Sequence, residues 1–248
     1  MPNSYDAEVI VVGAGPAGAT AATALAQQGH EVLLLDRSPF PRDKVCGDAI
    51  SREVVSLLYS LGMKEKILKA EAQGEFYPLD SFRLVSPHLY SLDVPFPPNE
   101  RTGAKSYVAP RIYLDATIQQ HAIDNGATFA VADVKEPLVE DGVVTGVMAQ
   151  MNGELRSLRS KIVIGADGVT SPIMRHLRPE SEQHEDKHRA VALRAYVEGL
   201  DFHRPHEVEF FLYDEILPGY AWIFRRPMTW RMLVWVCAWI TSVGSRAI

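Results

Sequence analysis

The hydrophobic positions of this chain change their period several times, and each change predicts a different element. Residues 9–12 form a continuous apolar run, an alanine-rich stretch with helical character ends at Gly29, and a second apolar run over residues 32–35 ends at Asp36. Continuous apolar runs of this length are typical of strands that are buried on both faces of a parallel sheet. The first 36 residues therefore predict a strand–helix–strand unit of the kind that binds dinucleotides.

The turn after the first strand has the composition that a dinucleotide site requires. Gly13 allows a tight turn, Gly15 lets the backbone approach a pyrophosphate, and Gly18 lets the helix pack close to the strand. The N-terminus of the helix presents backbone N–H groups to the phosphate charge. Asp36 follows Gly13 by 23 residues, at the end of the second strand, where its carboxylate can accept both ribose hydroxyls. We therefore expect an adenine dinucleotide site.

The middle of the chain predicts two further helices and a meander. Apolar residues with helical spacing follow Ser51, at Val54, Leu57, Leu58 and Leu61, and a second helix is expected over Tyr113–Asp124. Three strand-like runs then follow, at Val131–Glu140, Val143–Met151 and Glu154–Ile164. Asp141-Gly142 and Asn152-Gly153 join these runs, and such dipeptides favour two-residue hairpin turns. Short strands are expected over 76–109 and again over 190–224.

Composition narrows the class of protein. With 248 residues, 47% of them hydrophobic, the chain can form one large domain or two small ones, and its net charge of −6 gives no reason to expect nucleic acid binding. Its two cysteines, Cys46 and Cys237, are too few for a disulfide framework or a zinc site. The beginning of the chain has no signal-peptide pattern, and the late apolar run Met232–Ile240 is too short to span a bilayer. We expect a cytoplasmic protein, with peripheral membrane contact left open and with the oligomeric state undetermined.

The histidines suggest one alternative, a metal site. His184 and His188 are four residues apart with acids between them, which could outline a metal site, but a third ligand is not evident and the surrounding sequence is polar. A solvated face is the preferred interpretation, and the same holds for His203 and His206 around Pro205. We expect no metal.

A second motif separates the flavin enzymes from the nicotinamide enzymes. Residues 164–171 read Ile-Gly-Ala-Asp-Gly-Val-Thr-Ser and lie directly after the expected meander. This combination resembles the flavoprotein hydroxylase superfamily. The resemblance implies that FAD is the cofactor and that Asp167 approaches its pyrophosphate.

A third pair of motifs is more specific. The loop Pro41-Arg-Asp-Lys-Val-Cys-Gly-Asp48 and the segment Pro218-Gly-Tyr-Ala-Trp-Ile-Phe224 resemble the geranylgeranyl reductase family. The resemblance implies an FAD-dependent oxidoreductase that transfers hydride from reduced flavin to the double bonds of a polyprenyl lipid or isoprenoid. It also implies that the reductant is NAD(P)H or reduced ferredoxin.

The resemblance assigns expected roles to individual residues. Those expected to hold the adenosine half of FAD are Gly13, Gly15, Gly18, Asp36 and Arg37, with Val134 beside the adenine. Those expected near the flavin or in contact with the cofactor are Arg42, Cys46, Gly47 and Arg111. The expected catalytic residues are Cys46, Tyr220 and Trp222, with Tyr220 and Trp222 facing the isoprenoid and with Cys46 or Tyr220 orienting or relaying a proton.

The chain also departs from the family pattern. Asp48 and Ala49 stand where many relatives have further glycines, and Arg225 stands where the family has proline. A third family motif, a Gly-Asp element near the ribityl chain, is not found in the chain, nor is the C-terminal helical part of the substrate cavity. We therefore expect a truncated chain that is inactive as a reductase.

The last 24 residues are unlike the rest. Three of the four tryptophans fall between Trp230 and Trp239, without strand or helix periodicity. Adding one base before Arg225 permits the reading Pro-Ala-Ala-Asp-Asp-Leu-Ala-Asn-Val-Gly-Val-Gly-Val, which restores the family proline. We therefore expect a single-base deletion at the Phe224/Arg225 boundary.

The expected fold class is α/β. A Rossmann-like FAD-binding domain, with a parallel sheet and a β-meander crossover, is expected over residues 1–75 and 101–189. A mixed β-sheet substrate domain is expected over 76–100 and 190–224, followed by the frame-shifted tail over 225–248, so that the fold is C-terminally incomplete. Two alternatives remain: a flavin-dependent monooxygenase of the same fold, and a non-catalytic fragment that binds nucleotide.

Overall fold

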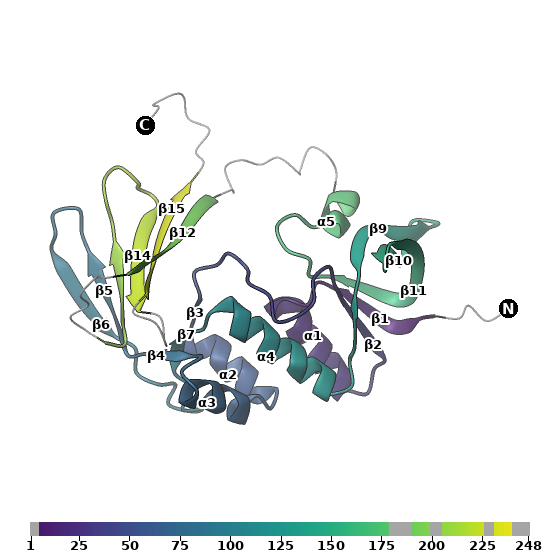
Figure 1. Cartoon of the computed structure of the whole chain (residues 1–248), viewed down its shortest axis with the longest axis horizontal. Helices are drawn as coiled ribbons and strands as arrows, with labels where there is room; N and C mark the ends of the chain where they lie inside the picture. The colour runs from purple at the N-terminus through teal and green to yellow at the C-terminus, as the bar shows by residue number, and fades with distance from the viewer. Residues whose placement is uncertain (1–4, 179–189, 199–204, 226–230, 240–248) are drawn as a thin grey trace. The chain divides into compact units, whose positions relative to one another are not determined.

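The computed structural model describes residues 5–178, 190–198, 205–225 and 231–239. The chain divides into two compact units (Figure 1). The first unit comprises residues 1–44 and 111–183, and the second comprises residues 45–110 and 184–248. We had expected residues 45–75 and 101–110 to belong to the FAD-binding domain, whereas in the structure they are part of the second unit.

The first unit is built on a six-stranded sheet with the strand order β8-β2-β1-β11-β10-β9. Its parallel part consists of β8 (Thr128–Val131), β2 (Val32–Asp36), β1 (Ala7–Val12) and β11 (Glu154–Gly165). The long strand β11 also pairs with the antiparallel strand β10 (Val143–Met151), which pairs in turn with the antiparallel strand β9 (Asp133–Glu140). The expected parallel sheet with a β-meander is therefore confirmed.

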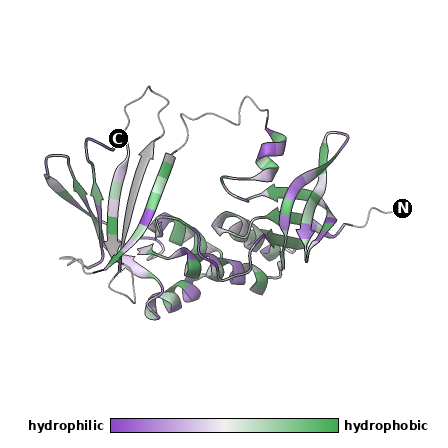
Figure 2. Cartoon of the chain, turned by 45° about the horizontal axis from the view of Figure 1, so that its top comes forward, coloured by the Kyte–Doolittle hydropathy of each residue, from purple (hydrophilic) through white to green (hydrophobic). Residues whose placement is uncertain are grey.

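The sequence pattern explains the layers of this unit. Side chains alternate between the two faces of a strand, so Ile10 and Val12 of β1 point to one face and Val9 and Val11 to the other. Ile10 and Val12 form a buried cluster with Val147 of the meander. The helices α1 (Pro16–Gln27) and α4 (Arg111–Asp124) lie side by side on the other side of the strands (Figure 1). In Figure 2 the strands of this unit are coloured largely as hydrophobic, as expected for a sheet covered on both faces.

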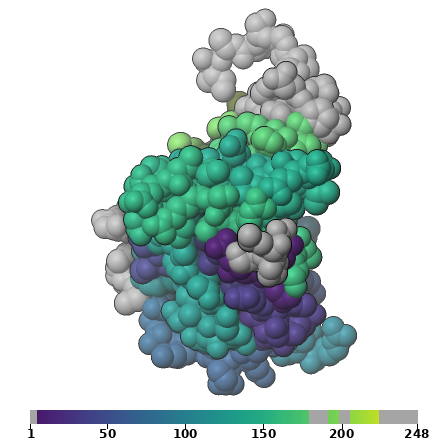
Figure 3. Space-filling view, turned by 90° about the vertical axis from the view of Figure 1, so that its right-hand side faces the viewer, coloured from purple at the N-terminus to yellow at the C-terminus, as the bar shows by residue number. Residues whose placement is uncertain are grey.

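The meander follows the expected hairpin chemistry. Asp141 and Gly142 have φ angles of 50° and 79°, and Asn152 and Gly153 have φ angles of 52° and 86°. Two successive positive φ angles define the type I′ turn that matches the twist of two-residue hairpins. In Figure 3 the meander forms a continuous band of teal and green atoms over the purple N-terminal segment. The unit is completed by the short helix α5 (Pro172–Leu177), whose Ile173 joins the same buried cluster.

The second unit contains two sheets and two helices. The larger, mixed sheet has the order β12-β15-β14-β13-β5-β6, with strands at Ala190–Glu198, Arg231–Trp239, Tyr220–Arg225, Glu207–Phe211, Ser81–Val85 and Ser91–Pro95. The smaller sheet has the order β3-β7-β4, with strands at Ala49–Ile50, Ser106–Val108 and Tyr77–Leu79. Since β7 pairs with both β3 and β4, residues 106–108 belong to this unit and not to the nucleotide-binding sheet.

The helices α2 (Arg52–Ser60) and α3 (Lys64–Ala72) precede the strand β4. Ser51 caps α2, because its side chain accepts a hydrogen bond from the Val54 N–H group, as is typical of serine at an N-cap. The apolar spacing correctly predicted this helix, but it does not tell which of the apolar side chains are covered. Val55 and Leu58 are buried, whereas Val54 and Leu57 are about half exposed. The packing partner decides which face is covered, and this information is absent from the local pattern.

Residues 231–239 form the strand β15, paired with both β12 and β14. This strand lies in the segment for which we expected a changed reading frame and found no strand periodicity. Backbone hydrogen bonds build the ladder, and a run rich in valine and tryptophan has high strand propensity whatever its origin. The strand therefore leaves the reading-frame hypothesis a prediction.

Candidate functional site

The first unit contains a cleft of about 740 Å³ at the carboxyl ends of β1 and β2. The residues that line it include the glycine turn, the ends of the meander and the loop after Gly165, and among them are Gly13, Gly15, Asp36, Arg37, Arg42, Arg111, Val134 and Asp167. Ligands of doubly wound α/β folds bind at this edge of the sheet. Eight of the residues expected to hold the cofactor therefore lie around one cavity.

The glycine turn is shaped by close backbone contacts. A β-carbon at Gly18 would lie 1.7 Å from the Gly13 carbonyl oxygen, so only glycine allows this approach of helix and turn. Gly15 is the N-cap of α1, and no side-chain oxygen caps the helix there. The helix therefore presents its first N–H groups to the cleft, which suits a phosphate ligand.

Asp36 is held in place at the end of β2. Its Oδ2 atom accepts hydrogen bonds from the Ala14 N–H group at 3.0 Å and from Nη2 of Arg42 at 3.1 Å, and its Oδ1 atom accepts one from the Ser38 N–H group at 3.0 Å. The carboxylate is 9% exposed and lines the cleft. A fixed carboxylate with remaining lone pairs is suited to accept a hydrogen bond from a ribose hydroxyl.

Two arginines flank the glycine turn, and a buried acid joins them. The Nη2 atoms of Arg111 and Arg42 lie 3.8 and 3.9 Å from the position that a β-carbon of Gly15 would occupy. Both guanidinium groups donate hydrogen bonds to Asp115, which is fully buried. Asp115 is not among the residues expected at the site, although its spacing of four residues from Arg111 on an expected helix is a signal of such a pair.

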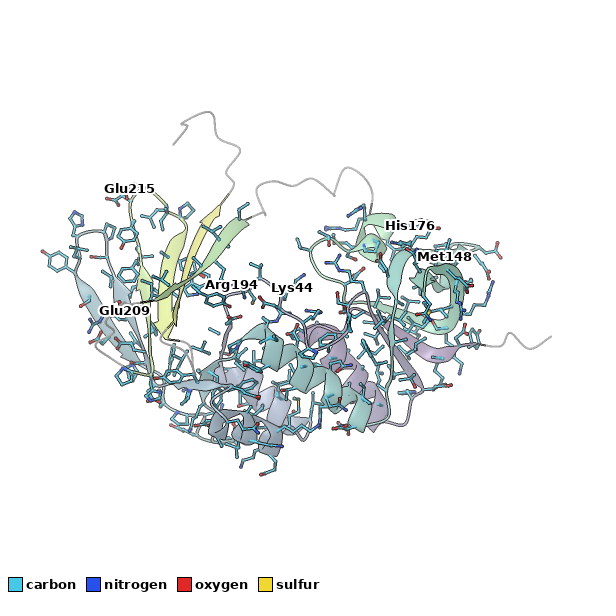
Figure 4. All side chains as sticks on the ribbon, in the orientation of Figure 1. Lys44, Met148, His176, Arg194, Glu209 and Glu215 are labelled. Atoms are coloured by element: carbon cyan, nitrogen blue, oxygen red, sulfur yellow. The ribbon has the colours of Figure 1, made fainter. Side chains whose placement is uncertain are left out.

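The Asp-Gly segment also reaches the turn. The Cα atom of Asp167 would lie 2.9 Å from a β-carbon at Gly13, so the two segments are in direct contact. Lys44, labelled in Figure 4, lines the same cleft and adds a cationic group. The backbone donors, the two arginines and the fixed carboxylate together match the needs of an adenine dinucleotide, and FAD fits this donor set.

The second unit contains a separate pocket of about 520 Å³. Its lining is mainly aliphatic and aromatic. It includes Cys46 and Gly47, which are expected near the flavin, and Tyr220 and Trp222, which are expected to face the isoprenoid and the flavin ring. Tyr220 and Trp222 are two residues apart on β14 and so point to the same face of the sheet. The structure therefore brings Cys46, Tyr220 and Trp222 to one cavity, while their catalytic roles stay a prediction.

Aromatic contacts define the wall of this pocket. The rings of Tyr220 and Trp222 lie 5.1 Å apart, and Phe210 of β13 lies 5.7 Å from Tyr220 and 6.4 Å from Trp222. These separations are typical of favourable aromatic pairs. Cys46 is free and half-buried at the same pocket.

The loop that carries Cys46 is held in place by Asp48, two residues further along the chain. Asp48 has a φ angle of 55°, a left-handed conformation that glycine adopts most easily and that aspartate tolerates better than most other residues. The Asp48 carboxylate is buried, lies 3.5 Å from the Tyr196 hydroxyl and lies 3.8 Å from a guanidinium nitrogen of Arg194, which Figure 4 labels on β12.

The histidines weighed as metal ligands divide into two groups. His184, His188 and His203 lie outside the described residues. Nδ1 of His206 lies 2.9 Å from the Pro78 carbonyl oxygen, and its ring stacks on Tyr77 at 4.6 Å. His206 therefore packs against the strand β4 and is not a solvated side chain.

Comparison with known proteins identifies the class. Residues 6–248 match the family model described as an FAD binding domain. The chain belongs to this family of FAD-binding oxidoreductases, which agrees with the geometry of the cleft in the first unit.

Individual relatives narrow the class further. The chain is 30% identical over 230 residues to digeranylgeranylglycerophospholipid reductase 1 of Methanococcoides burtonii, covering 91% of this chain and 52% of that protein. It is 32% identical to menaquinone reductase of Mycolicibacterium smegmatis, covering 88% of this chain and 52% of that protein. The resemblance to the geranylgeranyl reductase family is therefore confirmed. The chain spans about half the length of the curated relatives it matches.

Solved structures share the fold. A geranylgeranyl bacteriochlorophyll reductase-like protein of Thermoplasma acidophilum superimposes with a TM-score of 0.80 at 24% identity, covering 97% of this chain and 58% of that one. The myxobacterial chondrochloren halogenase also gives a TM-score of 0.80, at 20% identity, covering 94% of this chain and 52% of that one. Reductases and halogenases therefore share this architecture, and the fold alone does not separate their chemistry.

Proposed function

We propose that this chain contributes the FAD site and part of the substrate cavity of an enzyme that reduces carbon–carbon double bonds of a polyprenyl chain. The observation that carries this proposal is the largely apolar pocket of the second unit, which is lined by the thiol of Cys46 and the phenol of Tyr220 together with other aromatic rings. A polyprenyl chain offers no polar group along its length, so it is recognised by burial of apolar surface.

The residues of the pocket suit the required proton transfer. FAD, when bound and reduced, supplies a hydride to one carbon of the double bond. The other carbon needs a proton, and the thiol of Cys46 and the phenol of Tyr220 are our candidates for the group that donates it. Glu53 also lines the pocket, but a hydrogen bond from Arg52 lowers the pKa of Glu53 to about 2. Glu53 is therefore ionised at neutral pH and is a poor proton donor.

Anaerobic turnover tests the proposal. The protein would be loaded with FAD, reduced with dithionite and incubated with geranylgeranyl diphosphate, and the products would be analysed by mass spectrometry. We expect products that have gained two hydrogen atoms for each reduced double bond once the reading frame after Phe224 is restored, and no product from the 248-residue chain, which we expect to be inactive. Peroxide or a hydroxylated product in air would support the monooxygenase alternative. Full FAD content without any product would support the non-catalytic alternative. Replacing dithionite with NADPH, NADH or reduced ferredoxin would identify the electron donor.

A lipid substrate also implies contact with a membrane surface, and we place the enzyme in the cytoplasm at that surface. No helix among the described residues is long and apolar enough to cross a membrane. Leu89 and Tyr90 in the turn between β5 and β6 are 74% and 79% exposed, and Leu92 in β6 is 61% exposed. Residues 84–92 carry no Lys, Arg, Asp or Glu. Glu215, in the loop between β13 and β14 (Figure 4), carries a negative charge and would not attract anionic lipids, so neutral vesicles are the suitable test. Co-sedimentation with neutral phosphatidylcholine vesicles that Tyr90→Ser weakens would support this contact, whereas no co-sedimentation would oppose it.

A further inference from the structure

Asp115 is a buried acid that cannot reach a ligand itself. It lies one turn into α4, and its side chain is 0% exposed. Its Oδ1 atom accepts a hydrogen bond from Nε of Arg111 at 2.5 Å, and its Oδ2 atom accepts hydrogen bonds from Nη2 of Arg111 at 2.7 Å and from Nη1 of Arg42 at 3.1 Å. A buried carboxylate stays ionised only when it is paired in this way. The pairing in turn fixes both guanidinium groups.

Both guanidinium groups also lie beside the glycine turn. Nη2 of Arg42 also donates to Oδ2 of Asp36 at 3.1 Å. The Nη2 atoms of both arginines lie within 4 Å of the empty β-carbon position of Gly15, which is the N-cap of α1. Two cationic groups and a helix N-terminus thus face the same part of the cleft.

The charges of this cluster alternate along Asp36, Arg42, Asp115 and Arg111. Each acid offsets one arginine, so the two cations can stay close together in the absence of a ligand. Long arginine side chains lose conformational entropy when a ligand orders them, and a group that is already fixed loses less. Holding the two guanidinium groups in advance should therefore strengthen the binding of an anion at Gly15.

We propose that Asp115 is a positioning residue for FAD binding: it fixes Arg42 and Arg111 so that both face the diphosphate of the cofactor. The inference rests on FAD binding alone and is independent of the polyprenyl substrate. It requires that the binding affinity of ligands with a diphosphate depends on Asp115, whereas the affinity of ligands without phosphate does not.

Binding measurements on Asp115→Asn test this role. The dissociation constants of FAD, ADP and adenosine would be measured by flavin fluorescence and calorimetry, and urea unfolding would report folding. We expect the affinities for FAD and ADP to fall roughly tenfold or more, because charge-assisted hydrogen bonds lose their geometry. Adenosine affinity should stay unchanged. The matched control is Asp124→Asn, an exposed acid on the same helix, for which all three affinities should match those of the wild type.

Two results would overturn the proposal. FAD and ADP affinities within twofold of the wild type in folded Asp115→Asn would show that the arginines need no positioning. An equal loss for adenosine would show that Asp115 only maintains the unit as a whole.

A second pair of variants covers the case in which Asp115→Asn does not fold. Arg42→Lys and Arg111→Lys keep the charge but lose the planar fork that Asp115 holds. We expect both variants to bind ADP several-fold more weakly, and wild-type affinity in both would mean that charge alone suffices and would overturn the proposal. Failure of the wild type to bind FAD or ADP would overturn the cofactor assignment as well, whereas failure to reduce a polyprenyl chain would affect only the proposed function.

Discussion

The indole ring of Trp222 lies directly against the backbone of Gly47. A β-carbon at Gly47 would lie 2.7 Å from Cζ2 and 3.3 Å from Cε2 of the indole. Carbon atoms in van der Waals contact are about 3.5–4.0 Å apart, so a side chain at position 47 cannot fit unless the ring moves. The loop that carries Cys46 and the strand that carries Trp222 are thus matched in shape within the second unit.

Gly47→Ala should destabilise the protein. Overpacking of this kind costs about 1–3 kcal/mol, and urea unfolding measures it. Trp222→Phe reduces the ring that causes the clash, so the double variant Gly47→Ala/Trp222→Phe should lose less stability than the sum of the two single variants. Additive losses would show that the contact with Trp222 is not what restricts position 47.

In a protein whose reading frame after Phe224 is restored, Cys46→Ser and Tyr220→Phe should lower turnover with little change in FAD content. A positioned general acid contributes about 100-fold or more, so the variant that removes the proton donor should lose about that factor in kcat. FAD content, read from the flavin absorbance after gel filtration, serves as the control. Turnover within a factor of three of the wild type in both variants would exclude these two side chains as proton donors.

Tyr107 should make stability depend on alkaline pH. Its ring is fully buried, and its hydroxyl donates a hydrogen bond to Oε2 of Glu71 at 2.7 Å. Burial first, and then this hydrogen bond, raise the pKa of Tyr107 well above its usual value of 10.0. Below pH 10 both the folded and the unfolded chain keep the proton, so the stabilisation is fully present. Above pH 10 the unfolded chain loses the proton first, so the free energy of unfolding falls.

Urea unfolding between pH 8 and pH 11 measures this effect. Tyr107→Phe removes the titrating group, so its free energy of unfolding should fall less steeply above pH 10 than that of the wild type. The exposed Tyr213 provides the matched control, and Tyr213→Phe should keep the wild-type slope. Equal slopes for all three proteins would contradict the assigned environment of Tyr107.

The coding DNA decides the reading-frame hypothesis. We expect the frame shifted by one base after Phe224 to encode Pro-Ala-Ala-Asp-Asp-Leu-Ala-Asn-Val-Gly-Val-Gly-Val. A shifted frame without this family-like continuation would make the hypothesis wrong. In the chain as given, residues 231–239 form β15 and pair with β12 and β14, so the presence of this strand does not decide the question.

The sequence by itself determined the nucleotide-binding half of the protein. The glycine spacing, the apolar runs and Asp36 are local signals, since strand, turn and helix are set by residues close together in the chain. The hairpin turns at Asp141-Gly142 and Asn152-Gly153 were predictable for the same reason, because their φ angles are a property of the dipeptide.

Only the tertiary structure decided which distant residues meet. The local pattern did not show which side chains of α2 are buried, nor that α2 and α3 belong with β7 in the second unit. It also missed Asp115, because the link from this residue to Arg42 crosses 73 positions of the chain. An apolar pattern in the sequence does not specify which other segment will cover it. Ion pairs between distant residues form only when packing brings them together. The glycine turn can therefore be recognised in the sequence, whereas the cleft with its two positioned arginines exists only because the fold brings distant residues together.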